Sequence, residues 1–479
     1  MVDVIVIGGG PAGVTAALRA RELGASAVLI EKGQLGGTCT NDGCVPTRAL
    51  AKAARLMRDS EQFAHYGLIA GPPAVDFARV IARTQQVVYQ VHEKKQLIAH
   101  LEAANVRTIH GQGGARFVDA HHVAVAGEVI AGDKIILCAG GKPRRLNFPG
   151  AEYAVTHSDL WAMQRLPERM VIVGSGATGC QVASIMAAFG VAVTLVDVMP
   201  RILPTEDALV SSTMHAEFQK SGITVITGIK GIDAIRKTER LEFIYTKDDQ
   251  QQTLTTDVVM LSVGWIPDLE PLNLSAAGVQ TKGPYVQVDD HLRTTAANIY
   301  AAGDITGRMM LVQSADHQGR VAAENAVLGA NRVDENSLVP HGGFTDPEYA
   351  SVGLTEEAAA KDRAVAVAVV PYTDKDRAII DDRAVGFCKI VVDRETRQFL
   401  GAHVVGEQAV EVIQVAAAIM AGKLRVEDVS ALEFAYPTFA SILGLASRQI
   451  ARQLKAIPIE RQWREIGQLK LAEWERSTD

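Results

Sequence analysis

Residues 3–32, DVIVIGGGPAGVTAALRARELGASAVLIEK, decide the fold of the first part of the chain. A β-branched run, DVIVI, leads into the glycine turn GGGPAG, an alanine-rich helical pattern and a second strand, SAVLIEK. This order predicts a βαβ unit with Gly8, Gly10 and Gly13 at G-x-G-x-x-G spacing. Glu31 closes the second strand, about 20 residues after the turn, where an acid can accept a hydrogen bond from a ribose hydroxyl.

The same pattern returns in mid-chain. MVIVGSGATG carries Gly174, Gly176 and Gly179, and a helical stretch then leads to a strand that ends in Asp197. Glycines at this spacing let the backbone approach a pyrophosphate, and the helix N-terminus offers free N–H groups. We therefore predict two dinucleotide sites; the alternatives are a duplicated fold with one site lost, or tight turns that bind nothing.

Length and charge bound the class of protein. A chain of 479 residues is too long for one core and predicts three or four domains. A net charge of -7 without a long basic run gives no indication of nucleic-acid binding. No apolar run approaches the ~18 residues of a membrane span, and the N-terminus has no basic signal-type region. We expect a cytoplasmic protein.

The character of the sequence changes from about residue 340. GFCKIVVD and AHVVG are typical of antiparallel strands, and VEVIQVAAAIMAG is typical of a helix packed on one face. These patterns predict a separate α+β domain. The polar stretch 451–479, with Trp463 and Trp474, is predicted to be an amphipathic helix docked on its own chain or a partner subunit.

The segment GGTCTNDGCVPTRAL (residues 36–50) holds Cys39 and Cys44. C-x4-C is not the usual zinc spacing, and no second ligand pair lies nearby. If a helix begins around Thr40, both sulfurs lie near its first turn, where the dipole favours a thiolate. Arg48 would add positive charge on the same face, so we predict a dithiol that relays electrons. The remaining cysteines are predicted to be small buried residues: Cys138, Cys180 and Cys388.

Taken together, these motifs resemble the flavin-dependent pyridine nucleotide-disulfide oxidoreductases, the family of dihydrolipoamide dehydrogenase, glutathione reductase and mercuric reductase. The resemblance covers nearly the whole chain. Its further segments are AAGDIT with Asp304, FTDPEYASVGLTEEAA, GAHVVGEQAVEVI and a YPT segment. It implies an α/β fold with two Rossmann-like dinucleotide-binding domains and a C-terminal α+β dimerisation domain.

The resemblance also implies where the domains lie and which cofactors they hold. FAD would bind residues 1–147 and 269–335, NAD (with NADP possible) would bind residues 148–268, and residues 336–450 would form a homodimer. Residues 451–479 would be a C-terminal helical extension. The FAD positions would be Gly8, Gly10, Gly13, Glu31, Gly37, Thr38 and Asp304. The nicotinamide dinucleotide positions would be Gly174, Gly176, Gly179 and Asp197, and further cofactor-binding positions would be Ala115, Gly140 and Gly264.

The implied catalytic roles are unequal for the two sulfurs. Cys44 would face the flavin, Cys39 would exchange with substrate, and each site would be completed by the YPT loop of the partner subunit. Asp197 favours NADH, because an acid accepts a bond from a free 2′-hydroxyl and repels a 2′-phosphate. Arg201, four positions on, could soften that preference.

Two departures from the family concern its proton and charge chemistry. Where the disulfide reductases carry H-P-T-x-x-E, this chain has Tyr436-Pro437-Thr438-Phe439-Ala440-Ser441, so the histidine–glutamate dyad is absent. Tyrosine, with a pKa of ~10, is a poor substitute for an acid–base group poised near neutral pH. Mercuric reductases also carry a tyrosine near this place, but they usually end in a Cys-Cys pair that this chain lacks.

The second departure replaces the family's lysine–glutamate ion pair beside the flavin with Arg48 and Gln181. We expect a guanidinium without a carboxylate to stabilise reduced flavin and the Cys44 thiolate, and so to raise the redox potential.

The predicted function is transfer of electrons from NAD(P)H through FAD and the Cys39–Cys44 pair to a small-molecule or protein acceptor that the sequence does not name. Dihydrolipoamide dehydrogenase is the alternative that Asp197 favours and the lost dyad opposes. Reduction of mercuric or other metal ions is favoured by Tyr436 and opposed by the missing C-terminal cysteine pair. From a different class, the chain could be a redox-sensing flavoprotein with little turnover, or an inactive relative that keeps FAD for structure.

Overall fold

The first βαβ unit builds a largely parallel sheet in the computed structural model, which describes residues 1–71, 73–335 and 338–457. The strand order is β3-β2-β1-β6-β5-β4, with β19 pairing to the carboxyl half of β6. Helices α1 and α8 pack together on one face, through alanines and other small residues. The elements are β1 (Val2–Ile7), α1 (Pro11–Glu22), β2 (Ala27–Glu31), β3 (Arg107–His110), β4 (Arg116–Phe117), β5 (His122–Val125), β6 (Glu128–Leu137), β19 (Ile299–Ala301) and α8 (Val312–Leu328).

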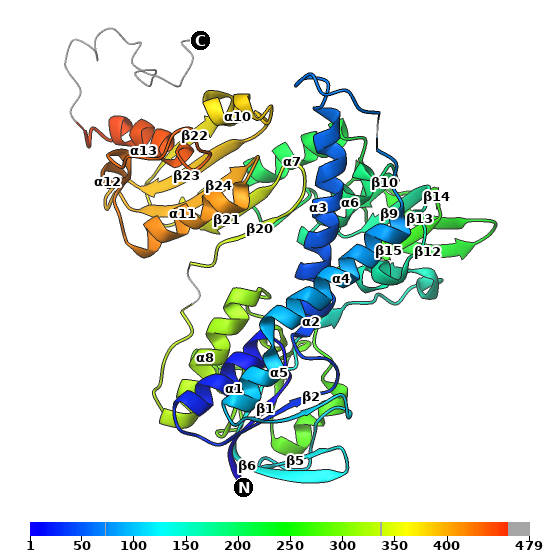
Figure 1. The fold of residues 1–479 in the computed structure, drawn as a ribbon, viewed down its shortest axis with the longest axis vertical. Helices are drawn as coiled ribbons and strands as arrows, with labels where there is room; N and C mark the ends of the chain where they lie inside the picture. Colours follow the sequence, from blue (N-terminus) through cyan, green and yellow to red (C-terminus); the bar gives the residue numbers. More distant parts are fainter. Residues whose placement is uncertain (72, 336–337, 458–479) are drawn as a thin grey trace.

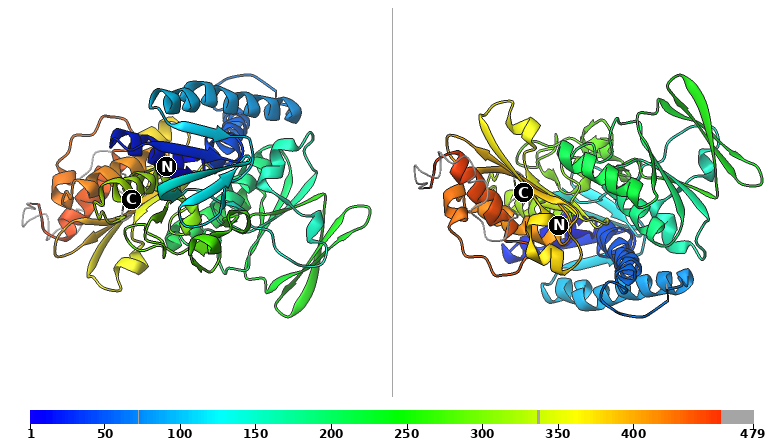
Figure 2. Two further views of the ribbon diagram at one scale, coloured as in Figure 1. Left: turned by 90° about the horizontal axis from the view of Figure 1, so that it is seen from below. Right: turned by 90° about the horizontal axis from the view of Figure 1, so that it is seen from above.

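The second glycine turn builds a five-stranded parallel sheet in the order β11-β10-β9-β15-β8. An antiparallel unit, β12-β13-β14, extends from it and projects from the rest of the molecule (Figure 2). The elements are β8 (Val155–Thr156), β9 (Arg169–Val173), α6 (Ala177–Ala188), β10 (Ala192–Val196), α7 (Ala208–Lys220), β11 (Thr224–Ile226), β12 (Gly231–Lys237), β13 (Leu241–Lys247), β14 (Gln250–Thr256) and β15 (Val258–Leu261).

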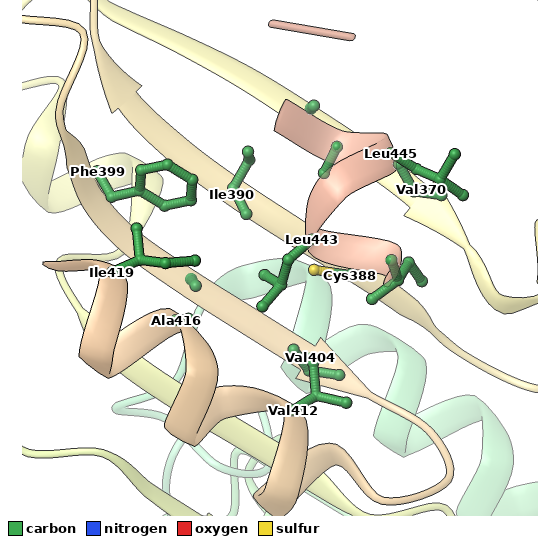
Figure 3. Close-up of a cluster of buried hydrophobic side chains, with 14 of the residues drawn as sticks. Val370, Cys388, Ile390, Phe399, Val404, Val412, Ala416, Ile419, Leu443 and Leu445 are labelled. Carbon is green, nitrogen blue, oxygen red and sulfur yellow. The ribbon is translucent and has the colours of Figure 1, made fainter. Parts of the chain in front are cut away.

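The last described part is an α+β domain, as its sequence pattern predicts. Five antiparallel strands in the order β20-β21-β24-β23-β22 carry α11 and α13 against a common apolar core (Figure 3). The elements are β20 (His341–Gly343), β21 (Tyr349–Gly353), α9 (Glu356–Ala359), β22 (Val365–Pro371), α10 (Asp376–Ile380), β23 (Phe387–Asp393), β24 (Phe399–Val405), α11 (Ala409–Ala421), α12 (Val426–Ser430) and α13 (Ile442–Gln453).

Helix α3 (Cys44–Glu61) joins the three parts (Figure 1). It starts at the first sheet and runs up beside α6 of the second sheet and along the last domain. Near its end, the Arg58 guanidinium donates to the carbonyl of Ser184 in α6 at 2.6 Å. Arg55 pairs with Glu407 of the last domain. Residues 36–50, which hold Cys39 and Cys44, are called the redox segment. Helix α3 therefore fixes the position of this segment, at its amino end, relative to all three domains.

The remaining elements connect these parts. The strands β7 and β16 pair where the chain crosses between the two dinucleotide-type sheets. These elements are α2 (Gly37–Asn41), α4 (Phe77–Lys95), α5 (Leu97–Ala103), β7 (Lys142–Pro143), η1 (Ala151–Tyr153), η2 (His157–Ala162), β16 (Trp265–Ile266), η3 (Glu270–Leu272), η4 (Leu274–Ala277), β17 (Thr281–Lys282), β18 (Tyr285–Val286), η5 (Asp304–Thr306) and η6 (Tyr372–Asp374).

One expectation from the sequence is wrong. The cysteines do not share the first turn of a helix that begins around Thr40, because the chain forms two helices, with Cys39 in α2 and Cys44 at the start of α3. Pro46 explains the break: it has no N–H to continue a helix from α2, but it is tolerated in the first turn of α3.

Two further expectations concern the ends of the molecule and membranes. Among the described residues, no helix has both the length and the apolar character needed to cross a bilayer. The predicted amphipathic helix over 451–479 lies largely outside the described residues, and so do Trp463 and Trp474.

Candidate active site

The first glycine turn forms a cradle that tolerates no side chains. A Cβ on Gly13 would lie 1.8 Å from the carbonyl oxygen of Gly8, and Gly8 itself has φ +111°. A Cβ on Gly37 would lie 2.7 Å from the Cα of Gly10, so the amino ends of α2 and α1 approach each other closely. Gly10 caps α1 without a side chain, and the first turn of α1 has no acidic residue. This end of α1 suits an anion such as a pyrophosphate.

Glu31 lies at the rim of this cradle. Its two carboxylate oxygens accept the backbone N–H groups of Gly9 at 2.6 Å and Gly33 at 2.8 Å. The segment that follows β3 passes beside Glu31. The N–H of Gly111 in this segment donates to the Glu31 carbonyl, and the segment continues to the buried Ala115. Glu31 is therefore held at the position where the Rossmann pattern places a ribose-binding acid.

The far side of the cradle carries Thr38, Gly141 and Asp304, and Gly140, with φ +65°, comes just before Gly141. The Thr38 hydroxyl lies 3.4 Å from the carbonyl oxygen of Gly141, and a Cβ on Gly141 would be 3.7 Å from that of Asp304. Burial raises the pKa of Asp304. Within the described part of the chain, its carboxyl group makes no side-chain hydrogen bond, so it is free for a hydroxylated ligand. The cradle, the open helix end and this carboxyl group together fit FAD.

The second glycine turn has the same construction. A Cβ on Gly179 would lie 1.8 Å from the carbonyl oxygen of Gly174, and Gly176 caps α6 without a side chain. Asp197 accepts the N–H of Ser175 at 2.6 Å, as Glu31 accepts that of Gly9. These residues fit a second dinucleotide.

Two more residues of the second turn region can be placed. The Arg201 guanidinium donates to the carbonyls of Pro204 and Glu206, both at 3.1 Å, and so faces its own loop. The Gly264 carbonyl accepts the N–H of Arg144 at 2.9 Å, where the chain crosses between the two dinucleotide-type sheets.

The two sulfurs of the redox segment are free thiols that share a hydrogen bond. The hydrogen bond from the Cys39 thiol lowers the pKa of Cys44 to about 7, although burial acts in the opposite direction. Donating this hydrogen bond raises the pKa of Cys39, and burial adds to the rise. Cys44 is therefore the sulfur that ionises first. The other cysteines, Cys138, Cys180 and Cys388, are buried, as predicted.

Lys95, at the end of α4, is a site residue that sequence patterns did not reveal. Its ammonium group donates to the Thr40 hydroxyl at 2.9 Å, and its positive charge lowers the pKa of Cys44, less strongly than the hydrogen bond from Cys39. One turn earlier, His92 lies 2.6 Å from the amide oxygen of Asn41. Helix α4 thus holds two of the four residues between the cysteines.

Arg48 does not contact Gln181 in the way that an ion pair would. Its guanidinium lies 3.1 Å above the centre of the Phe344 ring and 3.8 Å from the Glu348 carboxylate. The amide oxygen of Gln181 accepts the backbone N–H of Phe344 at 3.2 Å. The expectation that the guanidinium lacks a carboxylate is therefore wrong, because Glu348 supplies one. Burial raises the pKa of Glu348 and lowers that of Arg48.

Phe344 and Glu348 belong to the FTDPE segment, so the sequence did carry a signal for them. They line a cavity of about 260 Å³ beside α3, together with Arg48.

Tyr436 lies in the last domain, apart from the cysteines of its own chain. Its hydroxyl donates to the Asp376 carboxylate at 2.7 Å, and 54% of the residue is exposed.

Comparison with known proteins agrees with this geometry. Residues 2–319 match the model of the pyridine nucleotide-disulphide oxidoreductases, and residues 339–446 match the dimerisation domain of that family. The chain is 32% identical over 450 residues to a mercuric reductase of Lysinibacillus sphaericus, covering 93% of this chain and 82% of that one. It is 31% identical over 478 residues to a dihydrolipoyl dehydrogenase of Bacillus subtilis, covering 95% and 98%.

A solved structure gives the same result. The HOCl-induced flavoprotein disulfide reductase RclA from Escherichia coli matches with a TM-score of 0.83 and 26% identity, over 94% of this chain and 100% of that one. A Cu(II) complex of RclA matches with a TM-score of 0.82, over 93% and 99%. With its two glycine cradles, its adjacent thiols and these matches over nearly its whole length, the chain belongs to the pyridine nucleotide-disulphide oxidoreductases, flavoprotein enzymes that use FAD and NAD(P)H.

Proposed function

We propose that this enzyme passes electrons from NAD(P)H to the Cys39–Cys44 pair and from there to an acceptor that needs no histidine acid–base group. The observation that carries the proposal is the hydrogen-bonded thiol pair, in which the pKa of Cys44 is lowered to about 7 and that of Cys39 is raised. FAD would be held by the first glycine cradle, Glu31 and Asp304, and would supply the chemistry that links hydride transfer from the nicotinamide to two-electron reduction of a Cys39–Cys44 disulfide. The chain itself holds Cys44 as the readily ionised sulfur and Cys39 as its proton donor.

NADH is the proposed donor. Asp197 stands where the fingerprint carries a ribose-binding acid, and its carboxylate accepts the N–H of Ser175; Arg201, four residues on, is bonded to two carbonyls of its own loop. An acid at this position favours a 2′-hydroxyl and disfavours the 2′-phosphate of NADPH.

A soft divalent metal ion is the proposed acceptor. Reduction of an organic disulfide needs a proton for each leaving thiolate, which the histidine of the family dyad would supply. A thiolate-bound metal ion needs no such proton, and thiolates suit soft ions. No group of three or more histidine, cysteine or acidic side chains that could hold a metal was found in the described residues. Two sulfurs without a third ligand suit a passing substrate better than a resident ion.

The names of the relatives support this choice. One similar protein is a mercuric reductase, and one similar structure is a Cu(II) complex of a flavoprotein disulfide reductase. Dihydrolipoyl dehydrogenase is the second candidate, since the Bacillus subtilis relative matches over 98% of its length and Asp197 suits NAD. The absent dyad opposes it.

We also propose a cytoplasmic homodimer in which Tyr436 of the partner subunit lies over the dithiol. The match of residues 339–446 to a dimerisation domain supports the homodimer. In that position the tyrosine hydroxyl could donate a hydrogen bond to a bound acceptor, a role that its ordinary pKa permits.

A panel of acceptors tests the proposal. NADH oxidation is measured with lipoamide, glutathione disulfide, mercuric ion, cupric ion and a quinone, for the natural enzyme and for Cys39→Ser and Cys44→Ser. Cys388→Ala, which alters a buried thiol in the last domain, is the control. We expect turnover of a metal ion that both serine variants lose and the control keeps. Faster turnover of lipoamide than of either metal ion would overturn the choice of acceptor.

A further inference from the structure

Asp42, between the two cysteines, is bonded to a segment far away in the chain. The break between α2 and α3 leaves its carbonyl without a helical partner, because a continuous helix would need an N–H from Pro46. That carbonyl instead accepts from Nε2 of His157 at 3.1 Å and from Nε1 of Trp161 at 3.2 Å. Both partners lie in η2, beside β8 of the second dinucleotide-type sheet.

The side chain of Asp42 is also hydrogen-bonded to η2. One carboxylate oxygen accepts from the Trp161 indole at 2.8 Å, and the other accepts from the Ser158 hydroxyl at 2.6 Å. His157 is only 4% exposed and packs on the Trp265 ring, with centroids 4.7 Å apart. Burial lowers the pKa of His157, and the Asp42 carbonyl, which can only accept, faces its Nε2.

The loop is therefore held from two sides. Helix α4 holds Thr40 and Asn41 through Lys95 and His92, and η2 holds Asp42. The Asp42 attachment connects the loop between the two cysteines directly to the second dinucleotide-type sheet, through η2. Three donor groups on η2 hold this one residue, the Nε2–H of His157, the Ser158 hydroxyl and the Trp161 indole N–H, which is shared between the carbonyl and the carboxylate.

We propose that Asp42 is a positioning residue, which acts through Ser158 and Trp161 to keep the Cys39 thiol within hydrogen-bonding distance of Cys44. The inference rests on the proposed function of the dithiol, and it assigns no contact with substrate to Asp42. The charged groups that face Cys44 from neighbouring elements are Lys95 of α4 and Asp304 of η5, and neither takes part in the attachment.

A positioning role and a purely electrostatic role of Asp42 predict opposite shifts in the pKa of Cys44 when the carboxylate is removed. If the Asp42 carboxylate acted only through its charge, its removal would make Cys44 easier to ionise. If it acts by position, Asp42→Ala loosens the Cys39–Cys44 hydrogen bond and makes Cys44 harder to ionise. Ser158→Ala leaves the charge in place and should shift ionisation in the same direction as Asp42→Ala.

The test measures the rate at which iodoacetamide alkylates Cys44 in the reduced protein as a function of pH, with the modified peptide identified by mass spectrometry. We expect Asp42→Ala to raise the apparent pKa of Cys44 by about one pH unit, the size of one lost hydrogen bond. Ser158→Ala and Trp161→Phe should give smaller rises that do not add to that of Asp42→Ala. Gln164→Ala, an exposed neighbour of η2, should change nothing.

An unchanged or lowered pKa in folded, FAD-containing Asp42→Ala would overturn the inference, and so would full additivity with Ser158→Ala. The proposed function fails separately, if the natural enzyme reduces no acceptor through its cysteines, because alkylation does not require turnover. The long-wavelength absorbance of a thiolate beside oxidised flavin provides a second readout, which should weaken in Asp42→Ala at pH 7 and remain in Gln164→Ala.

Discussion

The pKa values of the two cysteines differ because Cys39 donates the hydrogen bond between them and Cys44 accepts it. Cys39 donates and is held in the thiol form, while Cys44 accepts and is stabilised as a thiolate. The pKa of Cys44, lowered to about 7, gives the enzyme a mixture of thiol and thiolate at neutral pH, where an ordinary cysteine at ~8.5 would be mostly protonated. A thiolate is the reactive form in exchange and metal binding.

The reactivity of Cys44 should depend on pH in the direction that its lowered pKa implies. A lowered pKa means that the thiolate is present above about pH 7 and is lost below it, so alkylation of Cys44 should rise through a midpoint near pH 7. Lys95→Gln should move the midpoint upward, by about half a pH unit, because a nearby positive charge is removed. Lys94→Gln, exposed on the same helix turn, is the control. A midpoint near that of an ordinary thiol in the natural protein would contradict this account.

Gln181 gives a second prediction for a single residue. Its amide oxygen holds the N–H of Phe344, and the Arg48 guanidinium stacks on that ring, so Gln181→Glu adds a negative charge close to the cation. If FAD binds beside Arg48, as the resemblance implies, the added negative charge disfavours the gain of electrons by the flavin, and its midpoint potential should fall. Gln164→Glu makes the same charge change on an exposed side chain elsewhere. Equilibrium redox titration measures the flavin midpoint potential of the three proteins. An unchanged or higher midpoint potential in Gln181→Glu would refute the argument.

Among the elements, strand β22 shows how alternation builds the last domain. Val370 is 0% exposed and packs in the core of Figure 3, while Val369 faces outward with 39% exposure. Val370→Ala should reduce the free energy of unfolding by about 2 kcal/mol, whereas Val369→Ala should change it by less than about 0.5 kcal/mol. Hydrogen exchange of the β23 amides, which pair with β22, measures the difference. Equal losses in the two variants would contradict the assigned faces.

The elements also separate what the sequence could predict from what it could not. Both βαβ units follow local rules, in which a β-branched run, a glycine turn and a terminal acid lie within about 30 residues. The two-helix break at Cys44 was missed, although Pro46 was visible, because the sequence does not name the groups that stabilise the break. Those groups, His157 and Trp161, meet Asp42 only through the tertiary fold.

For the whole molecule, helix α3 is the central connection. It carries Cys44 at one end and is bonded further along to α6 and to the last domain (Figure 1). The sequence predicted two glycine cradles and a dithiol, because each is a contiguous motif. It could not predict that Glu348 would lie beside Arg48 or that Lys95 would lie beside Thr40, since both contacts depend on how distant parts pack.

The role of Tyr436 depends on how two subunits assemble. Within one subunit its hydroxyl is bonded to Asp376 and lies in a different domain from Cys39. A dimer that brings the tyrosine of one subunit to the thiols of the other would explain why a residue so exposed stands where the family carries its acid–base histidine.

The central claim is that the cysteine pair lies on the path of electrons, and an anaerobic titration with NADH tests it most directly. The account predicts that the first equivalent produces long-wavelength thiolate–flavin absorbance while the flavin stays largely oxidised, and that a second equivalent is needed to bleach the flavin. Cys44→Ser should abolish the long-wavelength absorbance and take up one equivalent fewer. Complete bleaching of the natural enzyme by a single equivalent, without that absorbance, would contradict the account.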